Sequence, residues 1–215
     1  MKIVTIADTH GKHSKLMIPS GDILIHAGDI SMKGEKNEVE DFLEWFDKQN
    51  FEHKIFIAGN HDFFFERESD DYIQQTLPKS IVYLNDNCTS INGIKIWGSP
   101  ITPWFFNWAF NRHRGDSINR HWDMIPIDTD IVITHGPIFR TLDTTISGQH
   151  VGCKDLFNRI HVIKPKVHIC GHIHESYGTI VKNGIKFINA SVLDEKYELS
   201  NTPIIFEIEK SNNIP

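Results

Sequence analysis

The chain has 215 residues, of which 22 are basic and 28 acidic, so its net charge is −6. This length predicts a single domain over residues 1–215 with a substantial core. The acidic balance argues against a protein that coats nucleic acid, because it would repel phosphate backbones at long range. The 3 cysteines lack paired spacing and no apolar run approaches the ~20 residues of a membrane span, so we expect neither a disulfide framework nor a membrane segment, and a cytoplasmic location.

Five short apolar runs, rich in Ile and Val, predict strands that are covered on both faces, because they lack the alternation of a half-exposed strand. Each run leads into a cluster of polar residues. In chain order the runs are Ile3 to Ala7, Ile23 to Ala27, Ile55 to Ala58, Ile131 to Thr134 and Val167 to Cys170.

Helices are predicted between these strands. The first is indicated by apolar residues at positions i, i+3, i+4 and i+7, namely Val39, Phe42, Leu43 and Phe46. A second, shorter helix is indicated by Val151, Leu156, Phe157 and Ile160.

Later apolar runs predict plainer strands at Ile91 to Trp97, Gly178 to Lys182, Ile185 to Ile188 and Ile204 to Ile208. Asn183-Gly184 is a strong hairpin turn signal between the middle two. The order of the elements therefore predicts an α/β fold with two packed β-sheets and helices outside them.

The segment from Ser99 to Ile125, about 99–125, is predicted to be a long loop excursion between strands. It has no clean period and carries Trp104, Phe105, Phe106, Trp108, Phe110, Trp122, Arg112, Arg114 and Arg120. Long loops of this kind are often functional. Two interpretations stay open: the loop borders a site, or its aromatic residues form a small core that pins it to the body.

The polar clusters after the five strands supply candidate metal ligands. In α/β sheets, ligands gather beyond the carboxyl ends of the strands. The candidates are Asp8, His10, Asp29, Asn60, His135, His172 and His174. Oxygen and imidazole ligands suit Zn, Fe, Mn or Ni, and this set is too large for one tetrahedral ion. We therefore predict two ions.

The local geometry of these clusters is also predicted. Glycines flank several ligands at positions 11, 28, 59, 136 and 171, and we expect them to permit sharp turns at the strand ends. On an extended segment, alternate residues point the same way, which would aim Asp8 and His10 together, and His172 and His174 together. If these segments are turns, their geometry is set in another way.

These residues, in this order, resemble the motifs of the calcineurin-like metallophosphoesterase superfamily. The matching series is Asp8-x-His10, Gly28-Asp29, Gly59-Asn60-His61-Asp62, His135 and Gly171-His172-x-His174. Further stretches resemble its metallophosphoesterase-domain-containing (MPPED) subgroup: residues 21–29, 107–111, 134–137, 150–153, 171–175 and 189–191.

The resemblance implies a four-layer α/β/β/α sandwich that binds two divalent or mixed-valence metal ions, often Mn, with Fe, Zn or Ni as alternatives. It assigns one ion to Asp8, His10, Asp29 and His174, and the other to Asp29, Asn60, His135 and His172, so that Asp29 bridges them. It also implies phosphodiesterase activity, with cyclic nucleotides among the candidate substrates. The expected nucleophile is a hydroxide that bridges the two ions.

His61 is the candidate catalytic acid. It directly follows the ligand Asn60 but points away from it on an extended chain, and a histidine beside a phosphate can protonate the departing oxygen. The resemblance implies the same role. The alternative is a histidine that only hydrogen-bonds a ligand and shapes the site.

The substrate class is predicted from a missing motif. Phosphoprotein phosphatases of the superfamily continue Gly-Asp with an Asp-Arg pair, whereas here Asp29 is followed by Ile30-Ser31-Met32-Lys33-Gly34. The missing arginine favours a small phosphodiester or nucleotide substrate, with Arg112 and Arg114 as candidate substrate-binding residues. The alternatives are a broad phosphomonoesterase and a non-catalytic scaffold.

A few further polar residues have open roles. Asp62 could orient a neighbouring group or cap the next helix. His150 lies in a loop that could approach the site, Cys153 is expected to be structural, and Asn189 could hydrogen-bond near the metals.

Overall fold

The computed structural model describes residues 1–209, so the last six positions of the predicted domain lie outside the described residues. Two mixed sheets form the centre of the fold. The first has the order β13 (Ile204–Glu207), β1 (Lys2–Ile6), β2 (Ile23–Ala27), β3 (His53–Ile57), β4 (Ile81–Tyr83). The second has the order β11 (Gly178–Lys182), β12 (Ile185–Asn189), β10 (Val167–Cys170), β9 (Ile131–Thr134), β6 (Ile94–Ser99), β5 (Asn87–Ile91).

Parallel pairing dominates both sheets, and the antiparallel strands β13, β11 and β5 stand at edges. The sheets pack face to face through a layer of apolar side chains. Ile25 and Ile57 of the first sheet and Ile133 and Ile169 of the second are fully buried in this layer. Each such side chain contributes roughly 1.5–3 kcal/mol by leaving water.

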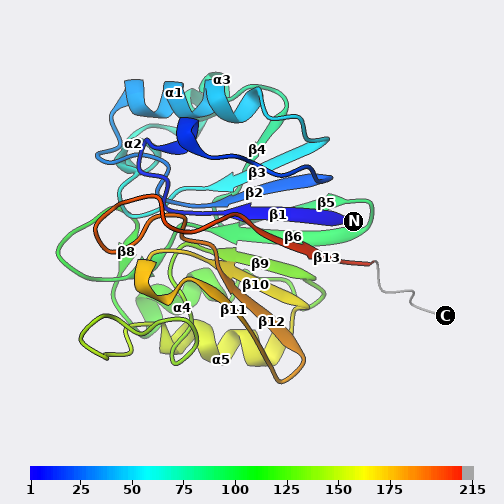
Figure 1. The fold of residues 1–215 in the computed structure, drawn as a ribbon. Helices are drawn as coiled ribbons and strands as arrows, with labels where there is room; N and C mark the ends of the chain where they lie inside the picture. Colours follow the sequence, from blue (N-terminus) through cyan, green and yellow to red (C-terminus); the bar gives the residue numbers. More distant parts are fainter. Residues whose placement is uncertain (210–215) are drawn as a thin grey trace.

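Helices cover the outer face of each sheet (Figure 1). Above the first sheet lie α1 (Lys36–Asp47) and α3 (Asp70–Thr76), and below the second lie α4 (Asp116–Trp122) and α5 (Lys154–Ile163). The shorter elements are η1 (His13–Lys15), α2 (Phe63–Arg67), β7 (Thr102–Pro103), β8 (Asn111–Arg112) and η2 (His174–Ser176). The predicted four-layer sandwich of two mixed sheets between helices is confirmed.

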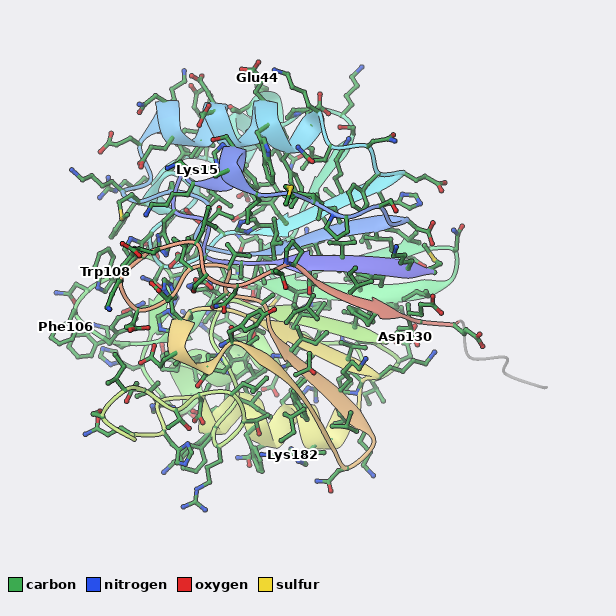
Figure 2. The ribbon with its side chains drawn as sticks, viewed as in Figure 1. Lys15, Glu44, Phe106, Trp108, Asp130 and Lys182 are labelled. Carbon is green, nitrogen blue, oxygen red and sulfur yellow. The ribbon has the colours of Figure 1, made fainter. Side chains whose placement is uncertain are left out.

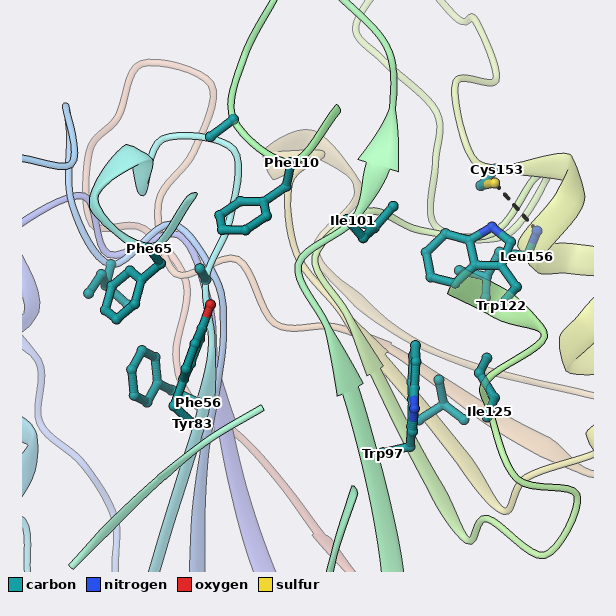
Figure 3. Close-up of a cluster of buried hydrophobic side chains, with 14 of the residues drawn as sticks. Phe56, Phe65, Tyr83, Trp97, Ile101, Phe110, Trp122, Ile125, Cys153 and Leu156 are labelled. Atoms are coloured by element: carbon teal, nitrogen blue, oxygen red, sulfur yellow. Dashed lines mark hydrogen bonds between the residues drawn. The ribbon is translucent and has the colours of Figure 1, made fainter. Parts of the chain in front are cut away.

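The apolar pattern explains why the helices sit where they do. Phe42 of α1 lies 5.7 Å from the Phe56 ring of the first sheet, and Trp122 of α4 lies 6.4 Å from the Trp97 ring of the second. Figure 3 shows Phe56, Phe65 and Tyr83 beside the first sheet and Trp97 and Trp122 beside the second, with the strands between the two groups and Phe110 near the first group. Cys153 is buried in the second and accepts a hydrogen bond from the Leu156 N–H, as a structural role requires.

Three predicted elements need correction. The run Ile91 to Trp97 is not one strand: Asn92 and Gly93 have φ of 49° and 79°, which makes a two-residue hairpin turn between β5 and β6. The second helix begins at Lys154, after its N-cap, and not at Val151. The excursion contains α4, whose buried Ile118 and Trp122 are four residues apart.

The loops that follow β1, β2, β3, β9 and β10 gather at the end of the molecule opposite the N-terminus in Figure 1. This placement follows from the parallel strands, whose carboxyl ends meet at one edge. Within residues 1–209, no helix combines the length and apolar character needed to cross a membrane.

Candidate metal centre

The structure brings the predicted ligands together from all five loops. Donor atoms of Asp8, His10 and His174 lie within 4.8 Å of one another, and so do those of Asp29, His135 and His172. Asp29 also belongs to a third such group, with His10 and His61. The carboxylate of Asp29 therefore faces both clusters.

Individual distances give the same picture. From Asp29 Oδ2, the Nε2 atom of His135 lies at 3.2 Å and that of His10 at 3.6 Å. His174 Nε2 lies 3.7 Å from Asp8 Oδ1. Asn60 joins the second cluster, because its Oδ1 lies 2.9 Å from His135 Nε2.

Three of the ligand histidines are oriented by main-chain carbonyls. Nδ1 of His10 donates to Ser31 O at 3.2 Å, that of His135 to Ala27 O at 3.0 Å, and that of His174 to Asp194 O at 2.8 Å. A carbonyl only accepts, so each Nδ1 carries a hydrogen and Nε2 is the ring nitrogen that faces the centre. This is how metal-binding histidines are commonly held.

The environment of His10 Nε2 tests directly whether a metal ion fits this site. It is buried and has no hydrogen-bond partner among the described residues. Buried nitrogen atoms are normally paired, and a metal ion would satisfy this one. The donor set of carboxylates, imidazoles and one amide oxygen, turned toward each other at these distances, fits two divalent ions.

Three glycines beside the ligands are required by space. A Cβ on Gly59 would lie 2.2 Å from Asp29 Oδ1, and one on Gly171 would lie 2.3 Å from Asp8 Oδ2. At Gly28, where φ is +97°, a Cβ would lie 2.5 Å from His135 Nδ1. The sequence predicted turn-forming glycines, but at Gly59 and Gly171 the ligand side chains lie directly against the backbone.

Of the two local geometries left open, the turn is the one observed, although Asp8 and His10 do point toward the same group of donor atoms. Asp8, His10, Asp29 and His172 have φ of 55°, 42°, 56° and 70°. A left-handed backbone is uncommon for residues with a side chain, and it is typical of functional sites. Hydrogen bonds from Asp8 N to Gly28 O at 2.9 Å and from His10 N to Asp29 O at 3.1 Å hold the loops in this form.

Asp62 ties two ligand loops together. Its buried carboxylate accepts hydrogen bonds from Gly59 N at 2.7 Å, Ser31 N at 3.0 Å and Ser31 Oγ at 2.6 Å. Its side chain makes no capping bond to α2, so the orienting role is the one observed. Burial, with the nearby charge of Asp29, raises the pKa of Asp62 to about 6.

Ser191 has a role that the sequence did not single out. Its hydroxyl donates to Asp8 Oδ2 at 2.5 Å, and the same oxygen accepts from His172 N at 2.9 Å. Asn189, two residues earlier, donates to Ile173 O at 2.8 Å. The only sequence signal was the Asn-Ala-Ser stretch quoted for the family resemblance, since these contacts join residues far apart in the chain.

The charges of the centre are strongly coupled. Burial raises the pKa of the Asp29 carboxyl, but the charge and hydrogen bond of His135, together with the charges of neighbouring histidines, outweigh burial and hold that pKa well below its usual value. His174 acts on Asp8 in the same direction. Burial lowers the pKa of His135 and His174, yet Asp29 and Asp8 raise it to about 9 in each. Burial lowers the pKa of His10 to about 4.

His61 stands beside the centre. Its main-chain N–H donates to Asp29 Oδ1 at 2.8 Å, and its Nδ1 donates to Met32 O at 2.7 Å. The ring stacks on Trp108 with centroids 4.3 Å apart and meets the His10 ring edge-on at 4.6 Å. A nitrogen of this ring lies within 4.8 Å of donor atoms of His10 and Asp29.

A cavity of about 640 Å³ opens over the centre. It is lined by the ligands Asp29, Asn60, His172 and His174, and by Trp104, Phe105, Phe106, Trp108 and Tyr197. Figure 2 shows Phe106 and Trp108 at the end of the molecule where the ligand loops gather. The excursion thus borders the cavity and also contributes Phe110 and Trp122 to the core.

The two candidate arginines differ in position. Arg114 lines the cavity and donates to Val151 O at 3.1 Å and Gly152 O at 3.2 Å. Arg112 forms an ion pair with Glu66 at 3.3 Å, and it is not one of the residues that line this cavity.

Known proteins resemble this chain in sequence and in fold. The family described as calcineurin-like phosphoesterase matches residues 1–176. Human metallophosphoesterase domain-containing protein 1 is 36% identical over 235 residues, which cover 99% of this chain and 72% of the human protein.

Two solved structures share the fold. Phosphopantetheinyl hydrolase from Mycobacterium tuberculosis has a TM-score of 0.66 and 14% identity, and the match covers 91% of this chain and 90% of that one. The protein TT1561 of Thermus thermophilus has a TM-score of 0.58 and 11% identity, with 87% and 88% covered. At these identities the likeness concerns the fold alone.

Proposed function

Because the chain belongs to the calcineurin-like phosphoesterase family, whose members are metal-dependent phosphoester hydrolases, we propose that it hydrolyses phosphodiesters of small or nucleotide type. The observation that carries this choice is the charge of the cavity wall. Among the described residues that line the cavity, Arg114 is the single lysine or arginine. Its guanidinium already bonds to two carbonyl oxygens.

A phosphomonoester carries more negative charge than a diester and calls for more cationic contacts. The segment after Asp29 supplies none: Ile30 and Ser31 turn their N–H groups to Asp62, and Lys33 does not line the cavity. The single charge of a diester suits this wall better. A broad phosphomonoesterase is the second candidate, and a scaffold is third, because partner binding does not require seven converging ligands.

The proposed ligand sets follow the two clusters. One ion is assigned to Asp8, His10, Asp29 and His174. The other is assigned to Asp29, Asn60, His135 and His172, with Asp29 shared. Mn is the proposed metal, because oxygen and nitrogen ligands without thiolate suit it; Fe, Zn and Ni are the alternatives.

Two bound ions would supply Lewis acidity at the phosphoryl oxygens and lower the pKa of the attacking water. The chain's own residues do the rest. Gly59, Gly171 and the left-handed ligand loops hold the donor atoms in place before substrate arrives. The aromatic residues of the excursion line the cavity over the centre and present apolar faces to a substrate bound there.

His61 is proposed to give a proton to the departing oxygen. Its Nδ1 is occupied by Met32 O, so Nε2 is the nitrogen that exchanges the proton. Stacking on Trp108 fixes the plane of the ring. This arrangement supports the role of His61 as an acid that does not need to be a metal ligand.

The test is a comparison of kcat/KM for bis(p-nitrophenyl) phosphate and p-nitrophenyl phosphate, with the protein loaded with Mn. We expect the diester to be preferred. A clear preference for the monoester would promote the second candidate. A fully metal-loaded protein that hydrolyses neither substrate would favour the scaffold.

A further inference from the structure

A second histidine reaches the cavity from a loop that the proposed chemistry does not use. His150 lines the cavity, and its side chain is 41% exposed. Its Nδ1 lies 2.8 Å from Oδ1 of Asp143, a carboxylate with no exposed surface. The other oxygen of Asp143 accepts from Arg140 N at 2.8 Å and from Gly152 N at 3.0 Å.

This geometry fixes the tautomer of His150. An ionised carboxylate only accepts hydrogen bonds, so Nδ1 carries the hydrogen and Nε2 is left to interact with a ligand. A buried carboxylate behind an imidazole is a common way to orient a functional histidine.

The loop around His150 is fastened to the metal centre. Thr144 N donates to Ser176 Oγ at 2.9 Å, and Ile146 N donates to Glu175 Oε1 at 2.8 Å. Both acceptors lie in η2, directly after His174. On the other side, Arg114 holds the carbonyls of residues 151 and 152. The position of His150 relative to the ligand loops is therefore fixed by contacts on two sides.

The cavity that His150 lines also has aromatic residues in its wall, and two of these contact histidines of the centre. Phe105 contacts His172 with ring centroids 5.2 Å apart, and Trp108 stacks on His61. Flat apolar groups pack well against such faces. A substrate with its phosphate at the ions would extend along this wall toward the rim.

We propose that His150 is a specificity-determining residue, which binds through Nε2 a polar group on the part of the substrate beyond the scissile phosphate, and that Asp143 positions it. This inference rests on the proposed function, because it takes the phosphate to lie at the metal centre. The substrate class is a phosphoester with a flat organic group that carries a hydroxyl, amine or carbonyl, as a nucleoside does.

The test separates binding of the organic group from binding of the phosphate. Dissociation constants for adenosine 5′-monophosphate and for inorganic phosphate are measured by calorimetry on Mn-loaded protein. The variants are His150→Gln, which can still donate to Asp143, His150→Ala and Asp143→Asn. The control is His121→Gln, because His121 forms the same kind of pair with Asp86 at 2.7 Å but does not line the cavity.

We expect each substitution of the Asp143–His150 pair to weaken binding of the nucleotide about tenfold, the loss of one well-placed hydrogen bond. Phosphate affinity should not change, and the control variant should match the wild type for both ligands. Thermal melting of each variant shows whether the loop is intact, and His150→Gln is informative even if Asp143→Asn unfolds.

Three outcomes would overturn the inference. One is unchanged nucleotide binding in His150→Gln and His150→Ala. Another is an equal loss for nucleotide and phosphate, since His150 would then act on the centre itself. The third is a wild-type protein that binds the nucleotide no more tightly than phosphate. Failure of the proposed function would be detected separately, because the wild-type protein would then not hydrolyse a diester.

Discussion

Gly59 and Asp29 are in such close contact that a Cβ on Gly59 would stand 2.2 Å from Asp29 Oδ1 and 2.4 Å from Asp29 N. The loops that follow β2 and β3 therefore pack directly against each other. The Asp29 carboxylate can occupy its position between the two clusters because residue 59 has no side chain. The position of Asp29 depends on its neighbour as much as on its own backbone.

The first prediction concerns this contact. Gly59→Ala should displace Asp29, reduce bound metal and lower activity by more than roughly 100-fold, with a loss of about 1–3 kcal/mol in the free energy of unfolding from overpacking. Gly136→Ala is the matched control, because it adjoins His135 and its Cβ would meet only Thr102 Cγ2 at 3.4 Å. For each variant, metal analysis measures the bound metal and denaturant unfolding measures the free energy of unfolding. Equal behaviour of the two variants would contradict the prediction.

The second prediction is the metal content. A crystal grown in excess Mn should contain two ions per chain, roughly 3.5–4 Å apart, with Asp29 between them. Asp29→Asn should weaken both sites, because Asp29 takes part in two of the groups of converging donor atoms. Anomalous scattering at the Mn edge identifies the ions. A single ion, or none, at these residues in excess Mn would contradict the assignment.

The third prediction concerns His61. p-Nitrophenolate leaves without a proton, whereas a ribose alkoxide does not. His61→Ala should keep its metals, lose little activity on bis(p-nitrophenyl) phosphate and lose about 10² to 10⁴ in kcat on a cyclic nucleotide. Rates on both substrates and metal content are measured together. Equal losses on the two substrates would assign His61 to positioning instead of proton transfer.

The fourth prediction follows from the pKa values of His135 and His174, which Asp29 and Asp8 raise to about 9. A metal ion binds only unprotonated nitrogen, so at about pH 7.5 binding of two ions should release close to two protons, and affinity should rise as the pH rises toward 9. In the metal-free protein, these raised pKa values stabilise the fold fully below about pH 6.5, the unfolded pKa of histidine, and this stabilisation is lost as the pH rises through about 9.

Calorimetry in buffers with different ionisation enthalpies measures the proton release. The increase in Tm on adding Mn should accordingly be larger at about pH 9 than at about pH 7. An affinity for Mn that stays flat between about pH 6.5 and 9 would show that these histidines are not protonated in the metal-free protein.

The fifth prediction compares the two arginines. Arg114→Ala should lower kcat/KM for a nucleotide substrate about tenfold, because Arg114 lines the cavity and holds the loop of His150. Arg112→Ala is the control, because Arg112 pairs with Glu66 outside the lining of this cavity. If both variants keep wild-type kcat/KM, the excursion serves packing alone.

The sequence was sufficient for the family and for the layer order, because both depend on local signals. The resemblance predicted from the strand-end motifs is confirmed by the family match over residues 1–176. The helix at Lys36–Asp47 was also predictable, since its buried Val39, Phe42 and Phe46 follow the helical period. Features that depend on residues close together in the sequence, such as strand-end motifs and helical periodicity, could therefore be predicted.

What sequence reasoning missed depends on distant partners. Ser191 acts through Asp8, 183 positions away, and no local pattern marks that contact. The role of Asp143 depends on its hydrogen bonds with His150 and Gly152, which form only when the loop is folded. The hairpin at Asn92-Gly93 was missed for a different reason: apolar Ile91 and Ile94 flank the turn and imitate a continuous strand.

The pairing of β1 with β13 has a consequence for how the protein is made. The Met1 amino group donates to Ile208 O at 2.8 Å across 207 positions of sequence, and Ser191 reaches back to Asp8. On the ribosome, the loop that carries Asp8 emerges early but cannot be completed until nearly all of the described chain has been synthesised. Contacts of such long range form slowly. The ligands assigned to the two proposed ions run from Asp8 to His174, so a nascent chain that ends before His135 lacks three of them.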